Sequence, residues 1–295
     1  MKKDILKLGM GVSVLFAVTA CDKNDGGGET PAGKDKITVT AGIEALTRAP
    51  HLNEDGSGYF TAGDLIAMTV TGGGKTVQTV YKVDGNLYWE DLDLPAETTE
   101  ATFTGCYPKP ASASDNKFTF DLSTAKDKDL LLAPGVKVSK RADTKVKLAF
   151  RHAMHKLVLN YASDGTYSAE QLGAAKTTCS AKSSCEVDMM AATIGRAGTK
   201  TSAFDATGKT VHFLLVPQAS DEVTLRIEIG EAVIEHTLIG LNDVLKNQNQ
   251  NIPATLDGGK CLTLNLTFGK DGIVVDSSEI GGWEDQGTID GEIEV

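Results

Sequence analysis

Short segments in which apolar and polar residues alternate recur along this chain, and they constrain its fold more than any other feature. Residues 262–268 place a leucine or phenylalanine at every second position, and residues 223–229 alternate in the same way. This period of two is typical of a β-strand with one buried face. Turn-forming sequences such as Gly73-Gly74 and Asp84-Gly85 separate the segments. The spacing predicts an all-β chain of antiparallel sandwiches.

The first such segment follows a polar stretch and spans residues 37–48. Its apolar side carries Ile37, Val39, Ala41, Ile43 and Ala45. Pro50 has no backbone N–H to give to a ladder, so the strand is expected to end before it. A similar pattern recurs at residues 288–295, where one side carries Ile289, Gly291, Ile293 and Val295. This last strand needs an acceptor, and its pattern suits one in the same molecule as well as one in another.

The N-terminus has the pattern of an export signal. Three lysines precede an apolar stretch at residues 8–18, which is too short for a permanent membrane span. Small residues then lead to Cys21, as in the lipobox of bacterial lipoproteins. We therefore expect a signal peptide at residues 1–20, lipidation of Cys21 and a flexible tether at residues 21–36. The alternative is an ordinary signal peptide followed by a chance cysteine.

Composition limits the functions that the chain can have. The formal net charge is −11, which argues against nucleic-acid binding, and 41% hydrophobic residues suffice for one or two cores. A polar stretch at residues 139–144 suggests domains at residues 37–141 and 142–295. The sequence Gly72-Gly73-Gly74-Lys75 lacks the Walker spacing and predicts a hairpin turn instead.

No motif predicts catalysis, a metal or a cofactor. His152 and His155 lie in an extended pattern, which predicts opposite faces rather than a shared metal, and His152 is expected in the core or at a sheet edge. The carboxylates near Trp89 are expected to be solvated. Cys179 and Cys185 are close enough in sequence for a small-loop disulfide, and four buried thiols are the alternative.

Several motifs in a fixed order resemble one known family. They are A-L-T-R-A (45–49), F-T-A-G-D-L-I (60–66), Y-K-V-D-G-N-L-Y-W (81–89), F-T-G-C-Y-P (103–108), D-L-L-L-A (129–133), V-K-L-A-F-R-H-A-M-H-K-L (146–157), V-H-F-L-L-V-P-Q (211–218) and E-I-G-G-W (279–283). Together they resemble the fimbrillin family, the type V pilin-like lipoproteins of Bacteroidales surface fimbriae.

The resemblance implies two tandem transthyretin-like antiparallel β-sandwich domains and a structural fimbrial subunit that supports adhesion. It also implies an outer-membrane lipoprotein precursor that an arginine-specific surface protease cleaves, here after Arg48 and before Ala49. Cleavage would remove the first strand, and the C-terminal strand of another fimbrial subunit, here residues 288–295, would replace it. The alternative is an uncleaved surface lipoprotein: a fimbrial anchor, a tip, or a module that binds glycan or a host protein through Tyr88 and Trp89.

Overall fold

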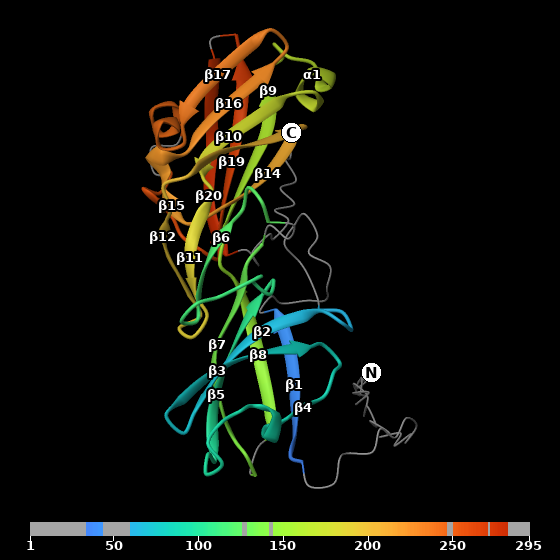
Figure 1. Ribbon diagram of the computed structural model, residues 1–295. Coiled ribbons are helices and arrows are strands. Elements are labelled where there is room, and N and C mark those ends of the chain that lie inside the picture. Colours follow the sequence, from blue (N-terminus) through green and yellow to red (C-terminus); the bar gives the residue numbers. More distant parts are fainter. Residues whose placement is uncertain are drawn as a thin grey trace, which may run out of the picture. The chain divides into compact units, whose positions relative to one another are not determined.

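The computed structural model (Figure 1) describes residues 34–43, 60–125, 129–141, 144–246, 250–270 and 272–282. These residues fall in one compact unit and are mostly β-strand. The all-β prediction is therefore confirmed. None of the helices among the described residues is long and apolar enough to cross a membrane.

The first part of the chain forms a seven-stranded sheet with the order β3-β2-β5-β7-β8-β1-β4. Its strands are β1 (Lys36–Ile43), β2 (Leu65–Gly72), β3 (Lys75–Lys82), β4 (Leu87–Tyr88), β5 (Glu100–Tyr107), β7 (Leu131–Ser139) and β8 (Lys145–His152), and η1 (Trp89–Asp91) follows β4. The predicted turn between β2 and β3 is present at Gly73 and Gly74. Both have positive φ angles, 57° and 74°, which glycine adopts without strain.

The second part contains two four-stranded sheets with the orders β14-β9-β19-β20 and β13-β10-β16-β17. Their strands are β9 (His155–Ser163), β10 (Lys176–Lys182), β13 (Thr201–Thr207), β14 (Thr210–Leu215), β16 (Thr224–Ile229), β17 (Ala232–Thr237), β19 (Lys260–Gly269) and β20 (Gly272–Gly282). Both sheets contribute residues to one apolar cluster, which includes Leu159, Leu225 and Leu264. The shorter elements are α1 (Ala169–Gly173), β15 (Gln218–Ala219), η2 (Ser220–Glu222), η3 (Ile239–Val244) and β18 (Thr255–Leu256).

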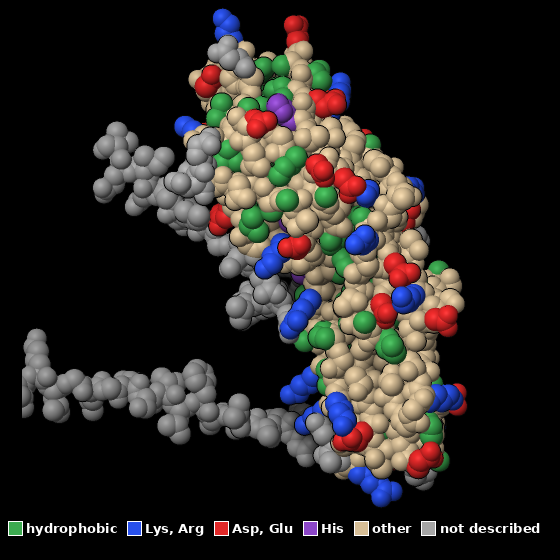
Figure 2. Space-filling view, turned by 90° about the vertical axis from the view of Figure 1, so that its left-hand side faces the viewer, with side chains coloured by type: hydrophobic (Ala, Val, Ile, Leu, Met, Phe, Trp, Pro, Cys, Tyr) green, Lys and Arg blue, Asp and Glu red, His purple; other side chains and the backbone are tan. Residues whose placement is uncertain are grey.

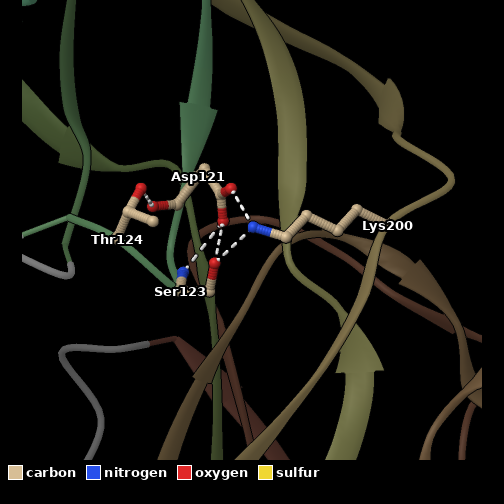
Figure 3. Close-up of polar contacts among 4 residues, drawn as sticks. All are labelled: Asp121, Ser123, Thr124 and Lys200. Atoms are coloured by element: carbon tan, nitrogen blue, oxygen red, sulfur yellow. Dashed lines mark hydrogen bonds and ion pairs between the residues drawn. The ribbon is translucent and has the colours of Figure 1, made fainter.

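A small sheet connects the two parts of the chain. Strand β6 (Lys117–Asp121) pairs with β11 (Ser184–Asp188), which also pairs with β12 (Thr193–Ala197). At the end of β6, Lys200 Nζ donates to Asp121 Oδ2 at 2.7 Å and to Ser123 Oγ at 2.8 Å (Figure 3). Partial burial disfavours the ionised carboxyl, but the hydrogen bonds from Lys200 and Ser123 outweigh it and lower the pKa of Asp121 to about 2.

The sheets do not divide where the sequence suggested a domain boundary. Residues 145–152 follow the expected boundary at 141–142, yet they form β8 of the first sheet. The chain passes to the second part between β8 and β9, and β6 pairs with a strand of the second part. The polar stretch at residues 139–144 is thus the connection between two strands of one sheet. The division into tandem domains stays a prediction.

Candidate functional site

The first strand lies in a parallel pairing that joins distant parts of the sequence. Strand β1, blue in Figure 1, lies between β8 and β4. Its residues 38–43 run parallel to residues 145–150 of β8 in continuous register, and its first two residues pair antiparallel with β4. Within the described strands, the other neighbour of β8 is β7, which pairs with it only at residues 151–152. Removing β1 would therefore leave a six-residue backbone edge of β8 without its ladder partner.

The inward face of β1 fills part of the first apolar core. Ile37 is 2% exposed, and Val39, Ala41 and Ile43 are half-buried against the cluster that contains Leu148. The predicted alternation of this strand is confirmed for these four residues. Full burial of an aliphatic side chain contributes roughly 1.5–3 kcal/mol, so Ile37 is the main apolar anchor and the half-buried residues add less each.

The outward face of β1 is polar and uncharged where it meets β8. Thr38 is registered with Lys145 and Thr40 with Lys147, and all four residues are exposed. Directly opposite residues on one face of a sheet interact, and unlike charges there are favourable. Neither threonine can form an ion pair with the lysine opposite it. The groove occupied by β1 therefore has an apolar floor and a basic outer rim.

A group of charged residues holds the start of β1, and we call it the N-terminal clamp. Lys34 Nζ lies 2.5 Å from Asp91 Oδ1, and the backbone N–H of Asp35 donates to Glu90 Oε2 at 2.8 Å. Lys140 Nζ lies 2.9 Å from Glu90 Oε1 and 3.8 Å from Asp35 Oδ2. The hydrogen bond from Lys140 lowers the pKa of Glu90, and the bond to Asp91 raises the pKa of Lys34. The side chains of these groups are 22–46% exposed, so solvent partly screens the clamp.

The clamp was not predicted from the sequence. Glu90 and Asp91 were expected to be solvated, and Lys34 and Asp35 were assigned to the tether. The available signal was a basic residue two positions before a strand and a pair of acids after Trp89. The sequence does not indicate that these two segments, which are more than fifty residues apart, come into contact in the fold.

Trp89 packs in the core and is not presented to solvent. It is 4% exposed, and its ring lies 6.3 Å from that of Phe103 in an edge arrangement. A buried ring cannot stack on a sugar. Trp89, one of the two aromatic residues that motivated a glycan-binding module, is therefore a core residue.

The four cysteines of the described part of the chain are free and buried, so the disulfide considered between Cys179 and Cys185 is not formed. Both residues lie in extended segments, β10 and β11, and belong to different apolar clusters. Six residues of strand span about 20 Å, whereas disulfide bonding needs Cα atoms within about 7 Å. Burial raises the pKa of Cys106, Cys179 and Cys185 to about 12 in each case, which keeps these thiols unreactive.

The two histidines near the start of the second part have separate hydrogen-bond partners. His152 Nδ1 lies 2.6 Å from Asp129 Oδ2, and both side chains are 4% exposed. His155 Nδ1 donates to the backbone oxygen of Asp257 at 2.8 Å if it carries the proton, and burial lowers the pKa of His155. The expectation that His152 is a satisfied core or edge histidine is confirmed. In the described ranges, no group of three or more His, Cys, Asp and Glu side chains could hold a metal.

A pocket of about 410 Å³ opens in the second part of the chain. Its described lining includes Lys182, Arg196, Pro217, Glu222 and Asp257, and it contains no aromatic side chain. Lys182 Nζ is already paired with Glu222 at 2.5 Å. On the face shown in Figure 2, basic and acidic side chains are interspersed rather than gathered by sign.

Several residues singled out from the sequence lie outside the described residues. They are Cys21, Ala45, Arg48, Ala49, Ile289, Gly291, Ile293 and Val295. Their roles therefore stay predictions. Among the sequence-derived site residues, the structure places the inward residues of β1, up to Ile43, together in one sheet.

The geometry defines an all-β protein whose first strand completes a sheet beside a strand more than a hundred residues further along the chain. The model of the fimbrillin-like family matches residues 33–283. This chain belongs to the fimbrillin-like family. A comparison with curated proteins gave no match.

Solved structures from Bacteroides show the same fold. A candidate cell adhesion protein from Bacteroides uniformis is 19% identical, with a TM-score of 0.63, over 86% of this chain and 100% of that chain. One from Bacteroides ovatus is 16% identical, with a TM-score of 0.58, over 85% and 98% of the two chains. One from Bacteroides thetaiotaomicron is 18% identical, with a TM-score of 0.51, over 78% and 92%. At these identities the likeness establishes the fold.

Proposed function

We propose that this chain is a structural fimbrial subunit that polymerises by strand exchange on the cell surface and supports adhesion. In this proposal it is exported as a lipoprotein precursor through Cys21, and an arginine-specific protease activates it by cleavage after Arg48. Its partners are other fimbrial subunits, and its precursor is held at the outer membrane by lipid. Membership of the fimbrillin-like family supports the coarser part, a fimbrial subunit at the cell surface.

The observation that carries the proposal is the way β1 is held. Strand β1 provides the ladder partner of residues 145–150 and buries Ile37. It also precedes Arg48 in the sequence, so a cut after Arg48 would separate it from the rest of the chain. A cut after Arg48 would leave β1 held without a covalent link, by hydrogen bonds, the buried Ile37, the half-buried side chains and a partly exposed clamp. Such a strand can be displaced by one that fits better, because an incoming strand restores the same backbone ladder.

Replacing Arg48 tests the activation step. We expect purified Arg48→Ala precursor to remain monomeric after treatment with an arginine-specific protease, because β1 stays covalently attached, whereas the unaltered chain assembles. Electron microscopy and size-exclusion chromatography would follow the assembly. Arg196→Ala provides a matched control, since Arg196 is an exposed arginine on β12, away from β1. Assembly of Arg48→Ala to the same extent as the unaltered chain would rule out this cleavage as the trigger.

A further inference from the structure

The inward face of β1 has a particular order of side-chain sizes. Along the strand, Ile37 and Val39 are large, Ala41 is small and Ile43 is large. Ala41 is registered with the buried Leu148 of β8 and packs against the same cluster. A strand that takes the place of β1 must therefore present its smallest inward residue at this third position, because cores reject extra volume and lose stability from voids.

The C-terminal segment has the same set of sizes in the opposite order. From residue 289 onward its apolar side reads Ile289, Gly291, Ile293 and Val295, with the small residue second instead of third. Read backwards, the order becomes large, large, small, large, as in β1. Gly291 then meets the position of Ala41, and Val295 meets that of Ile37. Read forwards, Ile293 would fall on the Ala41 position and Gly291 would leave a void at the Val39 position.

We propose that the segment 289–295 of a second copy occupies the place of β1 in the reverse direction, antiparallel to β8. This inference rests on the proposed strand exchange and adds its direction and register. Ile289 takes the position of Ile43, and Ile293 takes that of Val39. Antiparallel pairing is slightly more stable per residue than parallel pairing, so the exchange improves the six-residue ladder with β8, while only the two-residue pairing with β4 becomes parallel.

Charge on the outer rim of the groove supports the same occupant. In this register Glu294 lies opposite Lys145 and Glu292 lies opposite Lys147, where β1 has only Thr38 and Thr40. Cross-strand pairs of unlike charge stabilise a sheet. In the forward direction Asp290 would lie opposite Lys145 instead. The acidic residues thus favour this segment over β1 in either direction, and the position of the glycine selects the direction.

Disulfide trapping between copies distinguishes the two directions. The full chain with Cys21→Ser is the background, and its remaining cysteines are buried. Three pairs are introduced: Lys147→Cys with Glu292→Cys, Lys145→Cys with Glu294→Cys, and Lys145→Cys with Asp290→Cys. After cleavage by the arginine-specific protease, oxidation and non-reducing electrophoresis, the first two are expected to give ladders of covalent oligomers. In the third, the cysteines would be separated by four residues of strand, about 13 Å, which is too far for a disulfide.

The first pair tests strand exchange regardless of direction, because residue 292 would lie opposite residue 147 in both directions. It therefore distinguishes failure of the proposed direction from failure of the proposed function. A ladder from the first and third pairs without one from the second would overturn the proposed direction and leave strand exchange intact. Polymers without a ladder from any pair would show that residues 289–295 do not occupy the groove. If the unaltered chain forms no polymers, the proposed function fails as well.

A size variant provides an independent readout that needs no new cysteine. Gly291→Val overfills the position of Ala41 in the reverse direction, and we expect it to slow polymerisation about tenfold. Ile293→Val is the matched control, because position 39 of β1 is itself a valine, and it should assemble near the rate of the unaltered chain. In the forward direction Gly291→Val would instead fill the Val39 position. Equal or faster assembly of Gly291→Val would therefore contradict the proposal.

Discussion

Truncation of the chain after residue 288 is expected to abolish polymerisation while leaving a folded monomer. The buried core residues that the structure describes lie between Ile37 and Val275, so the last seven residues are not needed to form these clusters. Under the proposed exchange, however, the same residues supply the donated strand. The truncated chain can accept a strand but cannot donate one.

The measurement is a comparison of assembly and thermal unfolding after protease treatment. We expect no fibres from the truncated chain alone, with a free energy of unfolding within about 0.5 kcal/mol of that of the full chain. Asp290→Asn is the matched control in the same segment, because in the proposed register residue 290 would lie on the outward face opposite Ala149. Unchanged fibre formation by the truncated chain would remove the donor assignment from residues 289–295.

Replacement of His152 by leucine is expected to destabilise the folded chain by about 3–5 kcal/mol, because it removes one partner from a buried polar pair. Asp129 Oδ2 lies 2.6 Å from His152 Nδ1, and Asp129 Oδ1 has no hydrogen-bond partner among the described residues. Burial raises the pKa of Asp129, and His152 opposes that rise. Without the histidine, the carboxyl in the folded state favours its protonated form even more strongly.

The destabilisation should depend on pH in a definite direction. A carboxyl whose pKa is raised by folding binds more protons in the folded state, so stability falls as the pH rises above its unfolded pKa of about 4. Chemical denaturation of His152→Leu should therefore show a larger loss relative to the unaltered chain at pH 7.5 than at pH 4.5. The double variant Asp129→Leu with His152→Leu is the control and should recover most of the loss. A single-variant loss under about 1 kcal/mol, independent of pH, would contradict this account.

The elements with strong alternation could be predicted from the sequence. Residues 262–268 lie in β19, and the alternating residues 223–229 contain β16, which pairs with β17. The pattern of β1 also identified its inward face. These segments bury one face and expose the other, so composition and burial follow the same period.

Other elements carried too weak a signal. Strands β12 and β13, residues 193–207, were not predicted, because they are edge strands with few large apolar residues and with side chains that are partly or fully exposed. Residues 169–181 show no clear alternation. They begin with helix α1, whose capping box joins Ser168 and Gln171, and continue into β10. The polar stretch at residues 139–144 did not reveal that residues 145–152 join the first sheet, because such a stretch indicates a turn without indicating which sheet follows.

Only part of the candidate site could be predicted, because the sequence of a strand does not indicate which other strand it pairs with. Alternation gives the faces of β1 but not its parallel pairing with β8, which joins residues 107 positions apart, as for Thr38 and Lys145. The N-terminal clamp depends on the same long-range arrangement. Once the register of β1 with β8 is known, the side-chain sizes and charges of residues 289–295 can be compared with those of β1 position by position.

The most direct test of the central claim is the N-terminal residue of the subunit in assembled fibres. Mass spectrometry of the first peptide would determine it without any substitution. Activation by removal of β1 predicts a chain that begins at Ala49. Assembled subunits that begin at a lipid-modified Cys21 and retain residues 37–43 would contradict the account, because β1 would then still be attached to a chain that had polymerised.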